Sequence, residues 1–274
     1  MHPIERLRYV ARASGADQTL LVRETAQALA AFRDDPAGLV AACRRIVDRH
    51  PTSGPLWWLC ARVLTSPDGQ REAWQAVEDI ERDATPAELS FALAEDATAC
   101  VIGWPELIGE ALPRRGDVDV LAVDSLGEGS GLVRRLMRDG IDALDVPTAG
   151  LGAAVLAADV VLLEAVALGS TGFVAVSGSL AAAAVARHAG VPVWVVAGAG
   201  RLMPPRMWDA LASRLVARSA EPWELDEEIV PLDLVDRVCG PAGLEAPEVA
   251  LRRIDCPVAP ELFDTGSAPG TYRR

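Results

Sequence analysis

Residues 160–196 read VVLLEAVALGSTGFVAVSGSLAAAAVARHAGVPVWVV, and this stretch decides the fold. It begins with the apolar run 160–166, passes into an alanine-rich helical pattern at Ser179–Ala189, and ends in the β-branched run 191–196. Apolar runs of strand length separated by helices are what a parallel sheet covered on both faces requires. The stretch therefore predicts a buried α/β unit.

The same alternation extends to both sides of this stretch. Further strand-like runs lie at 98–103, 118–123, 142–146 and 228–232. With helical segments between them, they predict a doubly wound, mostly parallel Rossmann-like sheet. We place this α/β domain at residues 91–274. Its last part is proline-rich, with an expected helix at 234–239 and a frayed tail after Phe263.

The chain before this domain has a helical pattern throughout. Apolar or small residues recur at three- and four-residue spacing at Leu21, Thr25, Ala28, Leu29 and Phe32, which is typical of an amphipathic helix. Asp35-Pro36 fits an N-cap followed by proline, and Thr85 to Glu88 fits a capping box. We therefore predict a helical N-terminal domain at residues 1–90.

Composition excludes several classes of function. The chain has 274 residues, of which 50% are hydrophobic, and a net charge of −13, which opposes general nucleic-acid binding. All 26 basic residues are arginine, and there is no asparagine. Sites that depend on a phosphate-loop or Schiff-base lysine are thereby excluded. The arginine, alanine, glycine and proline bias is typical of a GC-rich bacterial genome.

Nothing in the sequence indicates a metal, a cofactor or a membrane. The five cysteines are scattered without zinc-ligand spacing. The loop Ala197–Arg201 lacks a complete dinucleotide fingerprint. The N-terminus has no apolar signal core, and the longest apolar region carries Asp159 and Glu164. We therefore expect a cytoplasmic protein with no cofactor, no metal and no membrane or nucleic-acid partner.

Glycine- and serine-containing loops follow the predicted strands, at the sheet edge where α/β proteins bind ligands. Glycine lets backbone N–H groups approach an anion, although it also serves ordinary tight turns. We expect a small-molecule ligand at this edge. The candidate ligand-binding residues are Gly103, Asp124, Ser125, Thr171, Gly172, Ser177, Gly178, Ser179 and Arg201.

Three segments resemble the translation initiation factor 2B alpha/beta/delta family, over about residues 45–260. They are the helix start and strand at 177–196, His50 to Leu56, and Asp124 to Gly129. The superfamily also contains methylthioribose-1-phosphate and ribose-1,5-bisphosphate isomerases. The resemblance implies a homodimer and a phosphorylated sugar or nucleotide as ligand, and adds His50 and Thr52 to the candidate ligand-binding residues.

The isomerases of this superfamily use a cysteine and an acidic residue to move protons between sugar carbons. By resemblance, Cys100 and Glu164 take these places, and a thiol and a carboxylate can exchange acid and base roles. Alternatively, Cys100 is an ordinary buried thiol and Glu164 a salt-bridged acid, since an acid in so apolar a run needs a polar partner. Two arginines of the family's pattern are replaced here, by His50 and Leu126.

Two functional hypotheses follow. The first is an initiation factor 2B-like protein that binds a sugar phosphate or nucleotide with weakened or lost catalysis, because the lost guanidinium groups weaken the hold on phosphate. The second is an active aldose–ketose isomerase that uses Cys100 and Glu164. The second requires both side chains to face one cavity, and it fails if they lie on opposite sides of the sheet.

Overall fold

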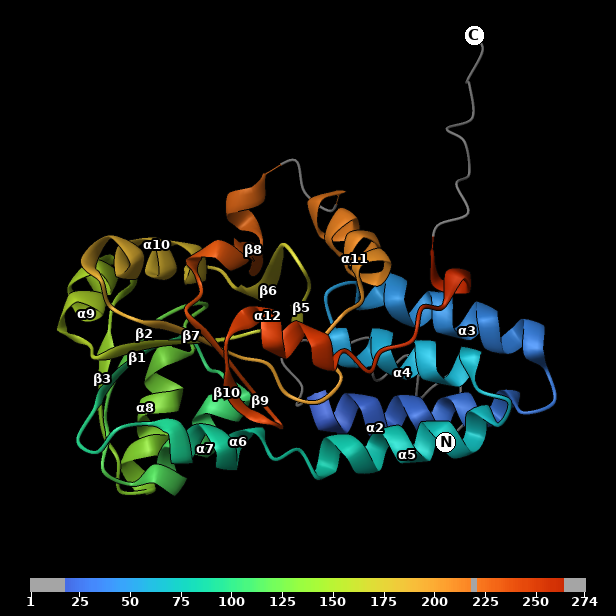
Figure 1. Ribbon diagram of the computed structural model, residues 1–274, viewed down its shortest axis with the longest axis horizontal. Helices are drawn as coiled ribbons and strands as arrows, with labels where there is room; N and C mark the ends of the chain where they lie inside the picture. Colours follow the sequence, from blue (N-terminus) through green and yellow to red (C-terminus); the bar gives the residue numbers. More distant parts are fainter. Residues whose placement is uncertain (1–17, 218–220, 264–274) are drawn as a thin grey trace, which may run out of the picture.

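The fold was analysed in a computed structural model, which describes residues 18–217 and 221–263. Figure 1 shows a group of helices at one end and an α/β layered region at the other. The predicted tail after Phe263 lies outside the described residues, as does the segment 1–17 of the predicted helical domain.

The described residues form a seven-stranded sheet in the order β10-β9-β7-β4-β1-β2-β3. All neighbouring strands are parallel except β9 and β10, which pair antiparallel. The prediction of a doubly wound, mostly parallel sheet is therefore confirmed. Its strands are β1 Thr98–Ile102, β2 Asp119–Val123, β3 Asp142–Val146, β4 Val160–Glu164, β7 Val193–Val196, β9 Arg237–Gly240 and β10 Gly243–Glu245.

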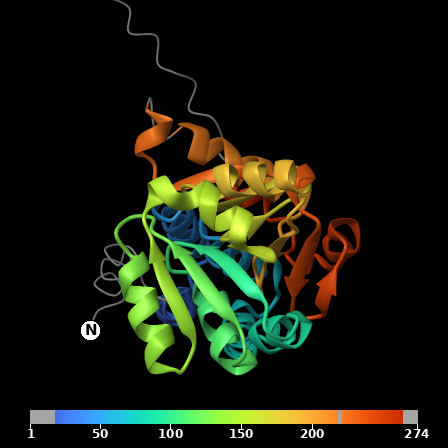
Figure 2. The same cartoon turned by 90° about the vertical axis from the view of Figure 1, so that its left-hand side faces the viewer.

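Helices cover both faces of this sheet (Figures 1 and 2). One face packs against α9 (Leu151–Ala157) and α10 (Ser179–Ala189), and the other against α6 (Thr85–Ala92), α7 (Glu106–Arg115) and α8 (Gly129–Arg138). Both faces are buried at the central strands β1, β4 and β7, which explains why these strands are almost continuously apolar in sequence. The edge strand β3 is largely exposed and carries Asp142 and Asp145.

A second, antiparallel sheet has the order β5-β6-β8. It consists of β5 (Ala167–Leu168), β6 (Gly172–Val176) and β8 (Glu227–Pro231). The run 160–166 is therefore not one strand, because β4 ends at Glu164 and the chain then turns into β5. The expected strand at 228–232 exists, but as β8 of this second sheet.

The expected helix at 234–239 is wrong. A 3-10 turn, η4 (Leu232–Leu234), leads instead into β9, which pairs parallel with β7. Val238 and Cys239 are buried on opposite faces of the sheet, as strand alternation requires. So short an apolar run does not distinguish helix from strand, and the free edge of β7 decides the outcome.

The N-terminal part contains four helices in the described residues. They are α2 (Gln18–Leu29), α3 (Pro36–Arg49), α4 (Gly54–Thr65) and α5 (Gly69–Glu81). The side chain of Asp35 caps α3 as predicted, since its Oδ1 accepts from the Gly38 N–H at 2.9 Å. Helix α4 lies at the centre and is buried along most of its length.

This helical core also includes chain from the second half of the sequence. Residues of α11 (Pro205–Ala217) pack against the helices, as do Cys256, Ala259 and Leu262. The division near residue 90 stays a prediction, but the two halves share this core. The remaining short elements are η1 Ala30–Phe32, η2 Thr148–Gly150, η3 Pro222–Glu224, α12 Pro247–Ala250, η5 Leu251–Arg253 and η6 Pro260–Leu262.

Candidate functional site

The carboxyl edge of the large sheet has a topological switch point between β1 and β4. From β1 the chain moves outward to β2 and β3, whereas β4 leads to β7 and β9 on the other side. Open α/β sheets bind ligands at this point. Gly103 follows β1 there with a φ of +66°, and its N–H donates to the Val123 carbonyl at 2.9 Å.

Glu164 ends β4 at the switch point, and its carboxylate is fully engaged. Its Oε2 accepts from the backbone N–H groups of Leu107 (2.8 Å) and Ile108 (3.2 Å), in the first turn of α7. Its Oε1 accepts from Nη1 of Arg201 at 2.9 Å. The Glu164 and Arg201 side chains are only 11% and 5% exposed. Glu164 thus caps a helix and neutralises a buried cation.

Arg201 extends this cluster toward the helical half. Its Nη1 also donates to the Ala165 carbonyl at 2.7 Å, and its Nη2 lies 3.8 Å from Oε2 of Glu106. The same Glu106 oxygen accepts from the Gln18 N–H at 3.4 Å, and Ser53 Oγ donates to Gln18 Oε1 at 2.7 Å. A continuous polar network therefore joins the start of α2 to the switch point.

The residues after β2 and β6 form a second polar group. Asp124 Oδ1 accepts from the Gly129 N–H at 2.8 Å, at the start of α8. Ser125 Oγ donates to the Ser177 carbonyl at 2.9 Å, and Ser177 Oγ donates to the Leu225 carbonyl at 2.5 Å. These predicted ligand-binding residues lie together, but their side-chain hydrogen bonds connect loops of the protein to one another.

Helix α10 also begins against a carboxylate. Oε1 of Glu228 accepts from the N–H groups of Gly178 (2.7 Å) and Leu180 (2.9 Å), and Gly178 has a φ of +102°. Helix N-termini are natural anion sites. At α7, α8 and α10 these positions are held by Glu164, Asp124 and Glu228, so the protein's own carboxylates occupy the places that a bound phosphate would take.

Gly172 begins β6 of the second sheet, and Thr171 lies in the bend just before it. Thr171 Oγ1 accepts from Nε1 of Trp208 at 2.8 Å, and Gly172 pairs with Pro231 in the β6–β8 ladder. The structure therefore does not bring these two candidates to the carboxyl edge of the large sheet, because the chain has already left that sheet at β4.

The other three candidates from the sequence lie at helix ends. His50 is the C-cap of α3, Thr52 precedes α4 and is 7% exposed, and Ser179 begins α10 and is 1% exposed. The turn that contains Thr52 lies against the chain leaving β4, where the Gly54 N–H donates to the Val166 carbonyl at 3.2 Å.

Cys100 and Glu164 lie on opposite faces of the sheet. Cys100 pairs with Val161 in the β1–β4 ladder and faces the α9–α10 layer, where burial raises its pKa to about 12. Glu164 lies an odd number of residues beyond Val161 and contacts α7 on the other face. The structure does not bring this pair together, and it offers no shared cavity for a sugar carbon.

A cavity of about 400 Å³ lies at the carboxyl ends of β7 and β9. Three segments enclose it: the α5–α6 connection with the end of α5, the loop 197–202 after β7, and the β9–β10 turn with the chain around α12. Of the loops predicted to form the site, only the one after β7 lines it. Its wall contains Asp79, Arg82, Asp83, Ala84, Ala197, Gly198, Ala199, Gly200, Leu202, Val238, Gly240, Pro241, Ala242, Gly243, Glu245, Ala250, Arg253 and Asp255.

Two glycines allow the loop after β7 to form this wall. A Cβ at Gly198 would lie 2.2 Å from Oδ2 of Asp83, and one at Gly200 would lie 2.9 Å from Cε3 of Trp58. Gly200 also has a φ of +72°. Asp83 fixes the loop, since its Oδ2 accepts from the Ala199 N–H at 2.9 Å.

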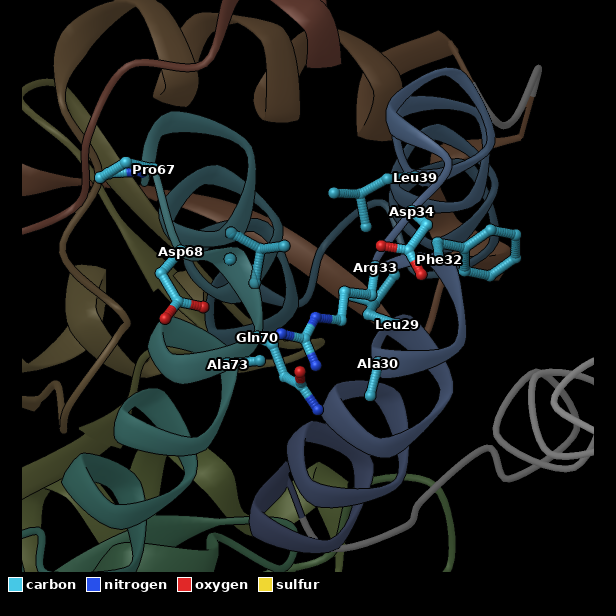
Figure 3. A pocket seen from close by; sticks show the side chains of 12 residues that line it. Leu29, Ala30, Phe32, Arg33, Asp34, Leu39, Pro67, Asp68, Gln70 and Ala73 are labelled. Carbon is cyan, nitrogen blue, oxygen red and sulfur yellow. The ribbon is translucent and has the colours of Figure 1, made fainter.

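A second cavity, of about 340 Å³, lies between α2, η1, α4 and α5 (Figure 3). Leu29, Phe32 and Leu39 contribute apolar walls, and Arg33 reaches from the end of η1 toward Gln70 of α5. Neither cavity is lined by a candidate residue from the sequence, but this second one also has no strand end beside it. We therefore take the cavity at β7 and β9 as the candidate site.

Sequence reasoning missed the residues that organise the carboxyl edge. Glu228 was not recognised because it is 50 residues from Gly178 in sequence. Asp83 carried a local signal, because an aspartate two residues before a threonine that starts a helix can accept from its backbone and hydroxyl. Asp255 carried none, since only the fold brings it to the cavity.

Residues 18–217 and 221–263 contain neither a metal-ligating cluster nor a membrane-spanning helix. No group of three or more histidine, cysteine, aspartate or glutamate side chains in them is placed to hold a metal ion. Over the same residues, no helix has both the length and the apolar character needed to cross a bilayer.

Comparisons with known proteins show what this architecture resembles. No protein-family model matches the chain, and no curated protein sequence matches it. Among solved structures, it is similar to the translation initiation factor eIF-2B of Pyrococcus horikoshii OT3, with 13% identity, a TM-score of 0.75, and coverage of 91% of this chain and 98% of that chain.

Two further similar structures come from Chaetomium thermophilum. A chain of the tetrameric eIF2B-beta2-delta2 complex has 15% identity and a TM-score of 0.72, covering 91% of this chain and 92% of that chain. The structure of eIF2B delta has 17% identity and a TM-score of 0.67, covering 86% of this chain and 96% of that chain. These structural neighbours agree with the resemblance found in the sequence: the chain has the fold of the eIF2B subunits, with a helical N-terminal part followed by a Rossmann-like sheet.

Proposed function

We propose that this chain is an initiation factor 2B-like small-molecule binding protein without isomerase activity, whose ligand binds in the cavity at β7 and β9. The observation that carries the proposal is the cavity of about 400 Å³ at the carboxyl edge of a doubly wound sheet. Its size suits a small organic molecule, and this edge is the usual place for ligands in such sheets.

The absence of catalysis is supported by the separation of Cys100 and Glu164. A proton shuttle between sugar carbons needs both groups within hydrogen-bond reach of one substrate. These two side chains face different helix layers, and Glu164 already accepts three hydrogen bonds from the protein. No observation favours the isomerase hypothesis over binding.

Ligand binding is tested by thermal shift and calorimetry with sugar phosphates, nucleotides, and neutral and amine-bearing small molecules. At 100 times its dissociation constant, a ligand adds about 2.7 kcal/mol to the free energy of unfolding. Ala242→Trp should fill the cavity and abolish this shift, whereas Ala153→Trp on the exposed face of α9 should keep it. The proposal is wrong if no compound binds, or if binding survives Ala242→Trp.

Catalysis is tested by incubating the protein with aldose and ketose phosphates and following their interconversion by NMR. We expect no conversion above background. Conversion that Cys100→Ala abolishes would show that the protein is an isomerase and would contradict the proposal.

A homodimer remains part of the proposal. One similar structure comes from a tetrameric eIF2B complex, which concerns that protein. Light scattering on this chain should give twice its 29.0 kDa mass. A monomer at all concentrations would remove the homodimer and leave the binding proposal standing.

A further inference from the structure

We infer that the cavity at β7 and β9 takes an organic amine, recognised by Asp83 and Asp255, and not a phosphate ester. This inference rests on the proposed function, since it assigns the charge class of the ligand at the same site. It concerns which groups remain available for a ligand after the protein's own interactions are counted.

The cations near the sheet edge are already neutralised. Arg201, the most deeply buried of them, is not part of the cavity wall, and it pairs with Glu164 and Glu106. On the wall itself, Arg253 donates to both oxygens of Glu245, at 2.7 and 2.6 Å. The other wall cation, the exposed Arg82, lies 3.4 Å from Oε2 of Glu78 in a surface pair. A phosphate ester would have to break one of these pairs to gain a charge-assisted partner.

The helix N-termini at this edge offer no alternative anion site. The first N–H groups of α7, α8 and α10 donate to carboxylates of the protein itself. A phosphate therefore finds neither a free guanidinium nor a free helix start among these groups, although both are its usual partners.

The cavity wall carries more carboxylates than guanidinium groups. Asp79, Asp83, Glu245 and Asp255 face only Arg82 and Arg253. Asp79 pairs with Arg62 at 2.6 Å, and Glu245 pairs with Arg253.

Two carboxylates on the wall form no ion pair with a basic side chain of the described residues. Within this part of the chain, neither Asp83 nor Asp255 has a guanidinium or imidazole nitrogen within 4.0 Å. Partial burial raises the pKa of Asp255, and its own backbone N–H, the Trp58 side chain and the more distant charge of Arg62 oppose that rise.

The carboxylate of Asp83 is held in place by neutral donors. Its Oδ1 accepts from the N–H and hydroxyl of Thr85, at 2.9 and 2.6 Å, and its Oδ2 accepts from the Ala199 N–H. These three bonds hold the side chain at the cavity wall. A carboxylate has about four acceptor positions, so one remains for a ligand.

The surroundings of β9 agree with a negative potential at this wall. The pKa of Cys239, between wall residues Val238 and Gly240, is raised to about 12, first by burial and then by the negative charges of Glu88 and Asp83. The same field attracts a cationic ligand.

The rest of the wall selects an organic cation. Metal ions are disfavoured, since no cluster of three ligating side chains occurs in the described residues. Ala84, Ala197, Leu202, Val238 and Ala250 supply apolar surface. A ligand with an apolar body and one amine group fits this combination, because the body removes apolar surface from water while the amine meets the carboxylates.

Three probes with one body and different head groups test the inference: 2-phenylethylamine, 2-phenylethanol and 2-phenylethyl phosphate. Calorimetry on the full chain at low ionic strength should give the tightest binding for the amine, by at least about tenfold over the alcohol, as a charge-assisted hydrogen bond predicts. The phosphate should bind more weakly than the alcohol.

Variants then locate the charge. Asp83→Asn and Asp255→Asn should each weaken amine binding at least about tenfold and leave alcohol binding unchanged, whereas Glu110→Gln on the exposed surface of α7 should change neither. Asp255 is exposed, so its variant remains informative even if Asp83→Asn destabilises the fold.

The outcomes separate the two claims. Preferential binding of the phosphate, or amine binding unaffected by both aspartate variants, overturns the amine inference and leaves the proposed binding function intact. If none of the three probes binds, the amine inference is also overturned. The proposed function is then decided by the thermal-shift panel of sugar phosphates, nucleotides, and neutral and amine-bearing molecules.

Discussion

Nη1 of Arg201 lies 2.9 Å from Oε1 of Glu164, where the last residue of β4 meets the loop after β7. This pair occupies the switch point of the sheet, the position where related architectures place ligands. Glu164 and Arg201, which the sequence suggested as site residues, therefore stabilise the fold by pairing with each other. The nearest cavity lies further along the same edge, beside β7 and β9.

Breaking this pair should be costly. Glu164→Gln leaves the buried Arg201 guanidinium with only the more distant Glu106 as a charged partner, and we expect a loss of about 3 kcal/mol in the free energy of unfolding, measured by urea denaturation. The exposed Arg82→Gln, which removes a surface pair with Glu78, should change it by less than about 1 kcal/mol. Equal effects of the two variants would show that the buried pair contributes no more than a surface pair.

Gly200 should tolerate no side chain. Gly200→Ala places a Cβ against the Trp58 ring at a φ of +72°. We therefore expect this variant to lose about 3 kcal/mol in its free energy of unfolding. Gly190→Ala is the matched control, because its φ is +76° and nothing lies within 4 Å of the added Cβ. It should cost about 1 kcal/mol. If both variants unfold at the same urea concentration, the contact with Trp58 is not as close as described.

Glu228 should behave as an internal substitute for a bound anion. Glu228→Ala removes the acceptor for the Gly178 and Leu180 N–H groups and should cost about 1 kcal/mol. Inorganic phosphate should then raise the melting temperature of this variant more than that of the unmodified protein. Glu110→Ala should show no such rescue. A phosphate response of the same size in all three proteins would contradict the assignment.

The thiols should be unreactive in the folded protein. Burial raises the pKa of Cys100 and Cys256 to about 12, so little thiolate is present near pH 8. All five cysteines are buried. We expect no fast reaction with Ellman's reagent at this pH, and reaction of all five in concentrated guanidinium chloride. Fast labelling of Cys100 in the native state would restore its candidacy as a catalytic group.

Glu128 should make stability fall as pH rises. Burial, followed by the charges of Asp124 and Asp226, raises the pKa of this carboxyl above its usual 4.5. The folded state therefore holds the proton more tightly than the unfolded chain, and this contribution is present at low pH and lost as pH rises through the folded pKa. Glu128→Gln should increase the melting temperature at pH 7 relative to the unmodified protein, with a smaller gain at pH 4. A gain that grows toward low pH would contradict the sign.

The large sheet was predictable because its central strands are buried on both faces. Runs such as 99–102 and 160–163 stay apolar without alternation, and helices separate the strands. The short strands were not predictable: β9 has four residues and β6 follows a glycine turn, so their pairing depends on neighbours that the sequence does not identify.

Helix starts show how local chemistry both helps and misleads. Asp35 caps α3 as predicted. The expected capping box at Thr85 is wrong, because Thr85 donates its hydroxyl to Asp83 and has no capping bond of its own to the helix. In the expected capping box the Thr85 side chain would accept a hydrogen bond from the helix, whereas in the structure Asp83 accepts from Thr85. Both arrangements place the start of α6 at nearly the same position.

The candidate site was less predictable than the fold, for a geometric reason. Strand residues alternate between faces, so an error of one position reverses where a side chain points. Cys100 and Glu164 sit in correctly identified strands, yet they face different helix layers. The cavity is closed by Asp83 and Asp255, which are 172 positions apart in the printed sequence and become neighbours of one cavity only through the fold.

The shared helical core has a consequence for synthesis. Trp57 and Trp58 of α4 lie in one cluster with Cys256, Ala259 and Leu262, near the other end of the chain. While the polypeptide is still emerging from the ribosome, the early helices lack this last wall and keep apolar surface exposed to water. They acquire a complete core only after residues 256–262 have been translated, about 200 residues after α4.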